Sequence, residues 1–209
     1  MKKEPNFWTT VAIVTMLVSV LWIVQFSQYF GIYDFHRFGN HPGNRSGLWG
    51  ILFSPFIHGS FEHLISNTLP IMVLLTVLLN AYPRLAIPVL IVIHLLSGAL
   101  VWLLAPPNGI HIGISGIIYG IAGFLVASGI FRKNRASTVI AMLVVMVYGG
   151  MIEGFFPKQG VSWESHLYGA LSGVIMAYLL RNTDLPLEVS DEEPPDEGHF
   201  FDPKPPIVN

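Results

Sequence analysis

Six long apolar runs set the strongest limit on what this chain can fold into. They cover roughly residues 7–30, 62–80, 85–105, 114–131, 137–155 and 165–181. A helix needs about 20 apolar residues to cross a bilayer, with a range of about 17–25. Charged residues make up only 11% of the chain, whereas soluble domains carry about 25%. Because backbone groups in lipid must be satisfied internally, the runs predict an all-α membrane protein with six transmembrane helices.

The lysines and arginines predict how these helices are oriented. If the N-terminus lies inside, the inner face carries seven of them, namely Lys2, Lys3, Arg84, Arg132, Lys133, Arg135 and Arg181. The outer face then carries three, namely Arg37, Arg45 and Lys158. Cytoplasmic loops are enriched in lysine and arginine. We therefore expect a multi-pass protein with both termini in the cytoplasm, in a bacterial plasma membrane.

Composition divides the chain into a six-helix core, residues 1–181, and a tail, residues 182–209. The tail holds eight acids, one lysine and six prolines, a composition typical of disorder. Within the core, the long first external loop at about 31–61 carries the aromatics Trp49, Phe53 and Phe56. These aromatics favour a loop that lies in the membrane interface, and an ordinary external loop is an equally weighted alternative.

Four polar side chains stand out in the apolar runs, because an unpaired polar group in lipid is costly. Each of three helices ends at an arginine expected on the inner side of the membrane. Asn67 lies 17 residues before Arg84, and Ser115 lies 17 residues before Arg132. His166 lies 15 residues before Arg181. At 1.5 Å per residue they lie about 25, 25 and 22 Å above the inner anchors. His63 lies one turn above Asn67. This common depth predicts one shared site, reached by water from the outer side.

The residue types at this depth suit acyl transfer. Taken alone, a serine in a membrane helix is more often explained by packing. Here Ser115 has a base at the same depth, His166, and a serine is a weak nucleophile until a base takes its proton. The Asn67 amide, a His63 ring N–H and the Ser115 backbone N–H are candidate donors to an oxyanion. No acid lies at matching depth, so the pattern favours a Ser–His dyad, with Tyr119 packed against the imidazole.

Small residues surround both candidate catalytic side chains. Gly113, Gly116 and Gly120 flank or follow the serine, and Gly169 and Gly173 follow the histidine at helical spacing. Such faces let two helices approach closely in a membrane. They therefore predict contact between the fourth and sixth helices, and generic packing without chemistry predicts the same contact.

Three short motifs, in order on the second, fourth and sixth runs, resemble those of the rhomboid family of intramembrane serine proteases. They are His63-Leu-Ile-Ser-Asn67, Gly113-Ile-Ser115-Gly116 with Tyr119 after it, and His166-Leu-Tyr-Gly169. The resemblance covers about residues 7–181. It implies a six-helix rhomboid-like bundle with a water-accessible cavity open to the outer side, and cleavage of membrane proteins within or near transmembrane segments. It implies Ser115 as nucleophile, His166 as base, and His63 and Asn67 in the oxyanion hole.

Two features of the first loop need separate comment. Many rhomboid proteins carry Trp-Arg there, whereas Trp49 is followed by Gly50 in this chain, which questions how the loop is anchored. His58 lies five residues before His63. A hydrogen bond within the loop and a solvated surface position are equally weighted interpretations of His58.

The remaining polar residues of the apolar runs and loops give weaker indications of function. We expect packing or interface roles for His94 and Glu153, and a place at the cavity mouth for His111. No His-Glu-x-x-His motif occurs, so we expect no metal and no cofactor. The expected partners are transmembrane-protein substrates and the lipid bilayer, without nucleic acid, and the oligomeric state stays open. The alternative functions are a non-catalytic rhomboid-like protein that binds membrane helices and, less favoured, a small channel or transporter.

Overall fold

The computed structural model describes residues 6–158 and 160–183, and the regular secondary structure of this part is helical, apart from one isolated bridge between Asn40 and His111. The α-helices are α1 Phe7–Tyr29, α2 Leu48–Phe53, α3 Phe61–Ala81, α4 Ala86–Leu104, α5 Ser115–Phe131, α6 Arg135–Tyr148 and α7 Trp163–Leu179. Four 3₁₀ helices accompany them, η1 His36–Phe38, η2 Arg45–Gly47, η3 Ser54–Phe56 and η4 Gly149–Phe155. Nearly all of the predicted acidic tail lies outside the described residues.

Side-chain caps explain where three of the long helices begin. Asn6 accepts the Thr9 N–H before α1 at 2.8 Å. Ser60 accepts the His63 N–H before α3 at 3.1 Å, and Asn134 caps α6 in the same way. A cap satisfies one of the backbone donors that the first turn of a helix leaves without an acceptor. The cap at Ser60 also sets the rotational start of α3, and with it the direction of the polar side chains one and two turns later.

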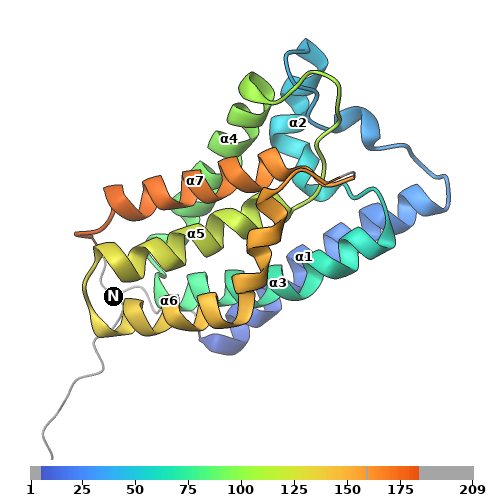
Figure 1. Cartoon of the computed structure of the whole chain (residues 1–209). Coiled ribbons are helices and arrows are strands. Elements are labelled where there is room, and N and C mark those ends of the chain that lie inside the picture. Colours follow the sequence, from blue (N-terminus) through green and yellow to red (C-terminus); the bar gives the residue numbers. More distant parts are fainter. Residues whose placement is uncertain (1–5, 159, 184–209) are drawn as a thin grey trace, which may run out of the picture.

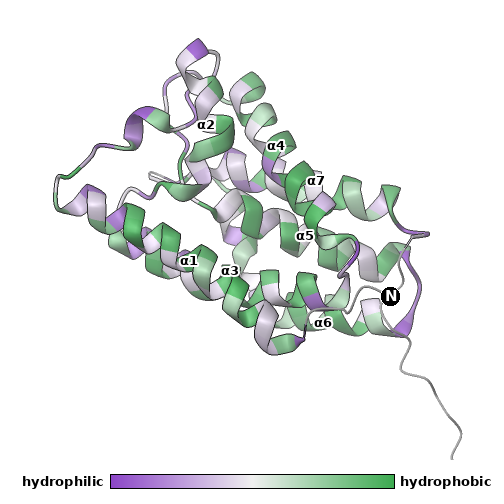
Figure 2. Cartoon of the chain, turned by 180° about the vertical axis from the view of Figure 1, so that it is seen from behind, coloured by the Kyte–Doolittle hydropathy of each residue, from purple (hydrophilic) through white to green (hydrophobic). Residues whose placement is uncertain are grey.

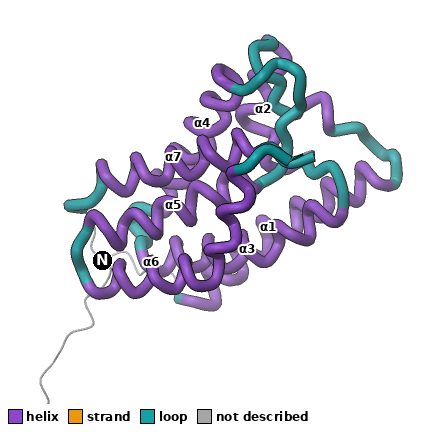
Figure 3. The backbone as a smooth tube through the Cα atoms, in the orientation of Figure 1, coloured by secondary structure: helices purple, strands orange, loops and turns teal. Residues whose placement is uncertain are grey.

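The helices α5 and α7 lie side by side through the middle of the bundle, with α6 along their edge and the pair α1 and α3 behind them (Figure 1). The short helix α2 packs against α4 at one end, where loops gather (Figure 3). Ten of the 17 residues of α5 are buried, against three of the 14 of α6. The helix that begins with Ser115 is therefore the innermost one, and it is shielded from lipid on most sides.

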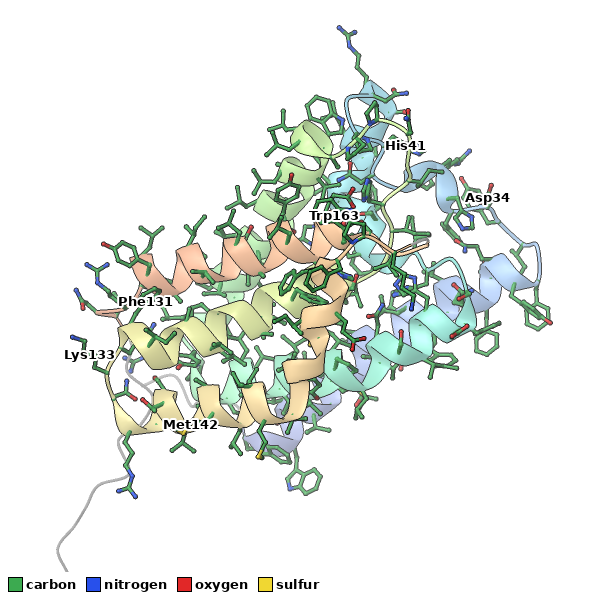
Figure 4. All side chains as sticks on the ribbon, in the orientation of Figure 1. Asp34, His41, Phe131, Lys133, Met142 and Trp163 are labelled. Carbon is green, nitrogen blue, oxygen red and sulfur yellow. The ribbon has the colours of Figure 1, made fainter. Side chains whose placement is uncertain are left out.

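Four segments of the described chain are long and apolar enough to cross a membrane: α1, α3, α4 and the continuous segment Arg135–Phe155. The helices α5 and α7 are also apolar and have 17 residues each. Hydrophobic residues cover the helices along their length, and hydrophilic ones gather at the two ends and in the first loop (Figure 2). Lys133, at the end of α5, lies far from Trp163, at the start of α7 (Figure 4). The chain is therefore an integral membrane protein.

The first loop is folded onto the bundle, and Gly50 is the residue that allows it. A Cβ at Gly50 would lie 2.3 Å from the backbone of Asn40. The Asn40 amide in turn donates to the Gly98 carbonyl of α4 at 2.8 Å. Trp49 stays 59% exposed and stacks on Phe53. Close backbone contact therefore anchors the loop at the position where a larger side chain would not fit.

The fifth apolar run, predicted as one span over 137–155, forms the continuous helical segment Arg135–Phe155 but changes helix type along its length. It is α-helical to Tyr148 and then tightens into the 3₁₀ helix η4. Gly149 and Gly150 stand at the change, and glycine disfavours the α-helix by about 1 kcal/mol relative to alanine. The tighter turn carries the end of this segment over α5 and α7, where it meets the site described next.

Candidate active site

Ser115 and His166 are joined by a hydrogen bond. Ser115 is the first residue of α5, and His166 lies in the first turn of α7. The serine Oγ is 2.9 Å from the histidine Nε2. On the other side of the ring, the histidine Nδ1 is 2.8 Å from the carbonyl oxygen of Gly154 in η4. Three separate segments thus converge on one imidazole.

These two contacts determine which ring nitrogen carries the proton. A carbonyl oxygen only accepts hydrogen bonds, so the Nδ1 of His166 must donate to Gly154. In the neutral ring, Nε2 is then left as an acceptor, and the Ser115 hydroxyl donates to it. The serine proton therefore already points at the base. The Gly154 carbonyl takes the orienting position that an aspartate holds in a catalytic triad.

The tyrosine one turn after Ser115 holds the histidine ring from its face. Tyr119 and His166 stack with ring centroids 4.1 Å apart and planes 5° apart. The Tyr119 hydroxyl donates to the Met151 carbonyl at 2.6 Å, which ties the stack to η4. A Cβ at Gly154 would lie 1.9 Å from that hydroxyl. The predicted contact between Tyr119 and the imidazole is therefore present, and it depends on a glycine in η4.

The predicted contact between α5 and α7 is also present, with one correction. A Cβ at Gly169 would lie 2.0 Å from the Gly116 carbonyl oxygen, and one at Gly173 would lie 1.9 Å from that of Gly120. Gly113, which was expected on the same face, does not meet α7. Its positive φ of 108° turns the chain just before α5, and a Cβ there would lie 2.7 Å from the ring of His63.

Asn67 and His63 line the same cavity as the serine and histidine. The cavity has a volume of about 1140 Å³. Asn67 is only 7% exposed, and its Nδ2 forms no hydrogen bond in the described part of the chain. A buried amide donor without an acceptor is costly, so a site that supplies an acceptor would relieve it. The Ser115 backbone N–H, at the first position of α5, likewise has no acceptor within the helix.

His58 is buried under the turn that carries Ser115, which decides between the two interpretations of this residue. It is fully buried, and its Nε2 accepts the Ile114 N–H at 3.4 Å. Its ring lies 5.0 Å from that of His63. Burial, together with the neighbouring His63, lowers the pKa of His58 to about 3. His58 is therefore neutral at pH 7 and acts as an acceptor for the backbone next to the serine.

This burial predicts that acid destabilises the fold through His58. The unfolded histidine has a pKa of about 6.5, above the folded value of about 3. The contribution to stability is complete above pH 6.5 and is lost progressively as the pH falls toward 3, because only the unfolded state takes up the proton. Each pH unit in this window costs about 1.4 kcal/mol.

The measurement is thermal unfolding in detergent at pH 7.5 and pH 5 for the wild type and His58→Gln. Glutamine keeps an acceptor but cannot take up a proton, so we expect the variant to lose less stability on acidification. His36→Gln is the control, since His36 lies partly exposed in the first loop beside Asp34, away from the Ser115 turn. Equal losses in the wild type and His58→Gln would contradict the prediction.

Other sequence-predicted polar residues lie around this centre or away from it. His111 lines the cavity and contacts the Ser162 hydroxyl through its Nδ1. His94 is half-buried in α4, and Glu153 is exposed in η4. Within residues 6–158 and 160–183, no three His, Cys, Asp or Glu side chains are grouped so as to hold a metal ion.

Sequence reasoning missed one residue of this centre altogether. Gly154 contributes only a backbone carbonyl and the space beside it, and neither leaves a signature in the amino-acid type. The glycine-rich run Gly149-Gly-Met-Ile-Glu-Gly154 is the one signal that was available. Such a run is compatible with an irregular helix end, but it does not indicate which carbonyl faces the histidine.

Comparison with known proteins gives a consistent result. The model of the Rhomboid domain matches residues 45–183. An uncharacterised protein of Mycobacterium tuberculosis is 33% identical over 187 residues, which cover 85% of this chain and 78% of that protein. RHOMBOID-like protein 5 of Arabidopsis thaliana is 26% identical over 63% of this chain and 44% of its own. Rhomboid-like protease 5 of Toxoplasma gondii is 28% identical over 71% of this chain and 18% of its own.

Proposed function

This chain belongs to the rhomboid family, and on that premise we propose that it is an intramembrane serine endopeptidase that works by a Ser–His dyad. Its substrates are membrane proteins cut within or near a transmembrane segment. The observation that carries the proposal is the geometry of one imidazole. His166 accepts from the Ser115 hydroxyl at 2.9 Å and is oriented from behind by the Gly154 carbonyl at 2.8 Å.

The proposed reaction follows from these contacts. Ser115 Oγ attacks the scissile carbonyl carbon while its proton passes to Nε2 of His166. The imidazolium that forms keeps its Nδ1–H bond to the Gly154 carbonyl, which stabilises the positive charge. The same proton then passes to the leaving amine as the tetrahedral intermediate collapses to an acyl-enzyme. Water, activated by His166, hydrolyses the acyl-enzyme and restores the serine.

The oxyanion of the intermediate needs donors that are in place beforehand. We assign this role to the Asn67 amide, the His63 ring and the Ser115 backbone N–H. The support for Asn67 is that its buried Nδ2 has no partner among the described residues. The support for His63 is its position against Gly113, two residues before the serine.

We further propose six membrane spans, α1, α3, α4, α5, α6 with η4, and α7, in a core that extends to about residue 181. The cavity opens to the outer side of a bacterial plasma membrane, with both termini in the cytoplasm and an acidic tail from residue 182. The inner cations of the sequence support this orientation. Lys133 lies at the end of α5 opposite to the one that carries Ser115.

A fluorophosphonate probe and a cleavage assay test the proposal together. Purified protein in proteoliposomes is expected to form a covalent adduct at Ser115, and to cut a transmembrane substrate at a bond that mass spectrometry locates. Only an activated serine reacts with the probe. A protein that binds membrane helices without catalysis would capture the substrate with neither adduct nor product, and that result would overturn the proposal.

Truncation of Asn67 is expected to lower the rate rather than the stability. Removal of one oxyanion donor costs about 10²–10³ in kcat, and the loss here is expected at the lower end because two donors remain. The change breaks no hydrogen bond from Nδ2, since that atom has no partner in the described chain. Asn67→Ala is therefore expected to keep KM within a few-fold and Tm near the wild type.

The measurement is kcat, KM and Tm for Asn67→Ala and His63→Ala. Asn80→Ala is the matched control, because Asn80 lies exposed on the same helix and donates to the Thr76 carbonyl. Slower fluorophosphonate labelling should accompany the lower kcat. An unchanged kcat in both site variants would remove these two residues from the oxyanion hole.

A further inference from the structure

The Glu164 side chain is largely buried in the wall of the cavity that also holds Ser115 and His166, and its carboxylate oxygens remain in contact with the cavity. It is only 8% exposed and lies in the first turn of α7. Within residues 6–158 and 160–183, no hydrogen bond or ion pair involves its carboxylate, and the ion pair in this part of the chain joins Asp34 and His36 elsewhere. Because the rest of the side chain is packed into the wall, the carboxylate can take a partner only from the cavity. A cation that enters the cavity would supply that partner.

The position at a helix N-terminus does not account for this burial. Glu62 is the counterpart of Glu164, in the first turn of α3 and in the wall of the same cavity, and it is exposed. An acid in the first turn is stabilised by the helix dipole while it stays in water. The helix end thus explains why an acid stands at each position, but not why the Glu164 side chain is packed into the cavity wall with only the cavity open to its carboxylate.

Among the described residues, no permanently charged cation is paired with Glu164 in the cavity. Lys158 lines the cavity but is exposed and forms no ion pair within the described chain. His111 contacts Ser162. Burial lowers the pKa of His111, although the Glu164 carboxylate opposes that effect. The His111 ring is therefore neutral near pH 7.

We propose that Glu164 binds a lysine or arginine side chain of the substrate, so that a basic residue close to the cut bond speeds cleavage. This specificity rests on the proposed protease function. An ammonium or guanidinium group brings both the missing charge and several N–H donors, and such charge-assisted bonds are stronger than neutral ones. The long apolar stems of these side chains also suit a cavity with apolar walls.

The size of the cavity limits where in the substrate this residue stands. A volume of about 1140 Å³ corresponds to a width of roughly 10 Å. An extended chain advances ~3.3 Å per residue, so about three residues cross that width. The basic residue is therefore expected within about three positions of the scissile bond, on one side of it.

The experiment compares matched substrates in proteoliposomes with the full-length protein. One transmembrane substrate is made with lysine, methionine or glutamate at each of the three positions before and after its cut bond. Methionine has the length and flexibility of lysine without the charge. At one position we expect kcat/KM for lysine to exceed that for methionine by about tenfold, which one hydrogen bond to a charged group can supply. Glutamate there is expected to be cut most slowly.

Variants of Glu164 then assign the preference to this residue. In Glu164→Gln, the ratio of kcat/KM for the lysine substrate to kcat/KM for the methionine substrate is expected to fall to near one. In Glu164→Lys, the glutamate substrate is expected to become the one that is cut fastest. Glu164→Asp keeps the charge and is expected to retain part of the preference. Glu62→Gln is the matched control, since it removes an exposed first-turn acid from the same cavity, and it should keep the wild-type ratio.

The outcomes separate this proposal from the proposed function. Absence of fluorophosphonate labelling and of any product from the wild type would refute the protease function itself. Cleavage of lysine and methionine substrates at equal rates at all six positions would refute only the specificity. If Glu164→Gln kept the wild-type ratio of lysine to methionine kcat/KM but cut every substrate more slowly, Glu164 would support α7 and would not bind the substrate side chain.

Discussion

Ser115→Ala and His166→Ala are each expected to abolish proteolysis, with kcat/KM at least about 10⁴-fold lower. The hydroxyl supplies the attacking atom, and the imidazole, 2.9 Å away, takes its proton. Neither has a substitute, because no second hydroxyl contacts His166 among the described residues. The double variant is expected to be little worse than either single one, since the pair acts as a unit.

The measurement is initial cleavage rate beside Tm for the three variants. Ser128→Ala is the matched control, because Ser128 is fully buried on the same helix and lies 13 positions after Ser115, far from the cavity. It is expected to cleave at the wild-type rate. Substantial cleavage by purified Ser115→Ala would show that Ser115 is not the nucleophile. Additive losses in the double variant would mean that the two residues act in separate steps.

Gly169→Ala and Gly173→Ala are expected to have the largest effects on stability. The new Cβ atoms would lie 2.0 and 1.9 Å from carbonyl oxygens of α5. Those oxygens belong to helix backbone and cannot rotate away as a side chain can, so α7 must move outward. Overpacking of a close-packed core costs about 1–3 kcal/mol or more. About 3 kcal/mol corresponds to a fall in Tm of roughly 6–12 °C for a chain of this length.

Activity is expected to fall with stability in these variants, since α7 carries His166. Gly116→Ala gives an intermediate case, because its Cβ would lie 3.2 Å from the Ser165 carbonyl oxygen. Gly150→Ala is the control, with nothing within 4 Å of the added atom. The expected order of Tm is Gly150→Ala highest, then Gly116→Ala, then the two variants of α7. Wild-type stability in Gly173→Ala would show that α5 and α7 do not depend on this close contact.

Both predictions depend on how closely α5 and α7 approach each other. The Ser115–His166 bond requires that α5 and α7 approach closely, since both side chains are short. The glycines one and two turns along these helices allow that approach, and the carbonyl oxygens of Gly116 and Gly120 lie against them. A substitution that pushes α7 away by a few tenths of an ångström lengthens the hydrogen bond between the dyad residues. Packing and chemistry are therefore coupled through the position of one helix.

The amino-acid sequence by itself determined the helical class, the positions of the long helices and the spacing of the polar residues along them. A long apolar run in lipid forms a helix, because the helix satisfies all backbone hydrogen bonds within the segment. The rise of 1.5 Å per residue then gives the distance along the helix between two residues from their separation in sequence. This is why Ser115 and His166 were predicted to meet, and why Tyr119, one turn after the serine, was predicted to contact the ring. The spacing of the glycines of α5 and α7 likewise indicated a close contact between the two helices.

The tertiary structure decided the features that depend on how each helix is rotated about its axis and on the course of the backbone between helices. A sequence pattern does not say which carbonyl faces a ring, so the role of Gly154 followed only from the course of η4 over α5 and α7. The burial of His58 beneath the Ser115 turn, and the meeting of Gly113 with His63 instead of α7, depended on how the first loop folds back. The unpaired Asn67 amide and the exposure of the Glu164 carboxylate to the cavity also depended on the tertiary structure, because the partners of a polar group are set by all the segments packed around it.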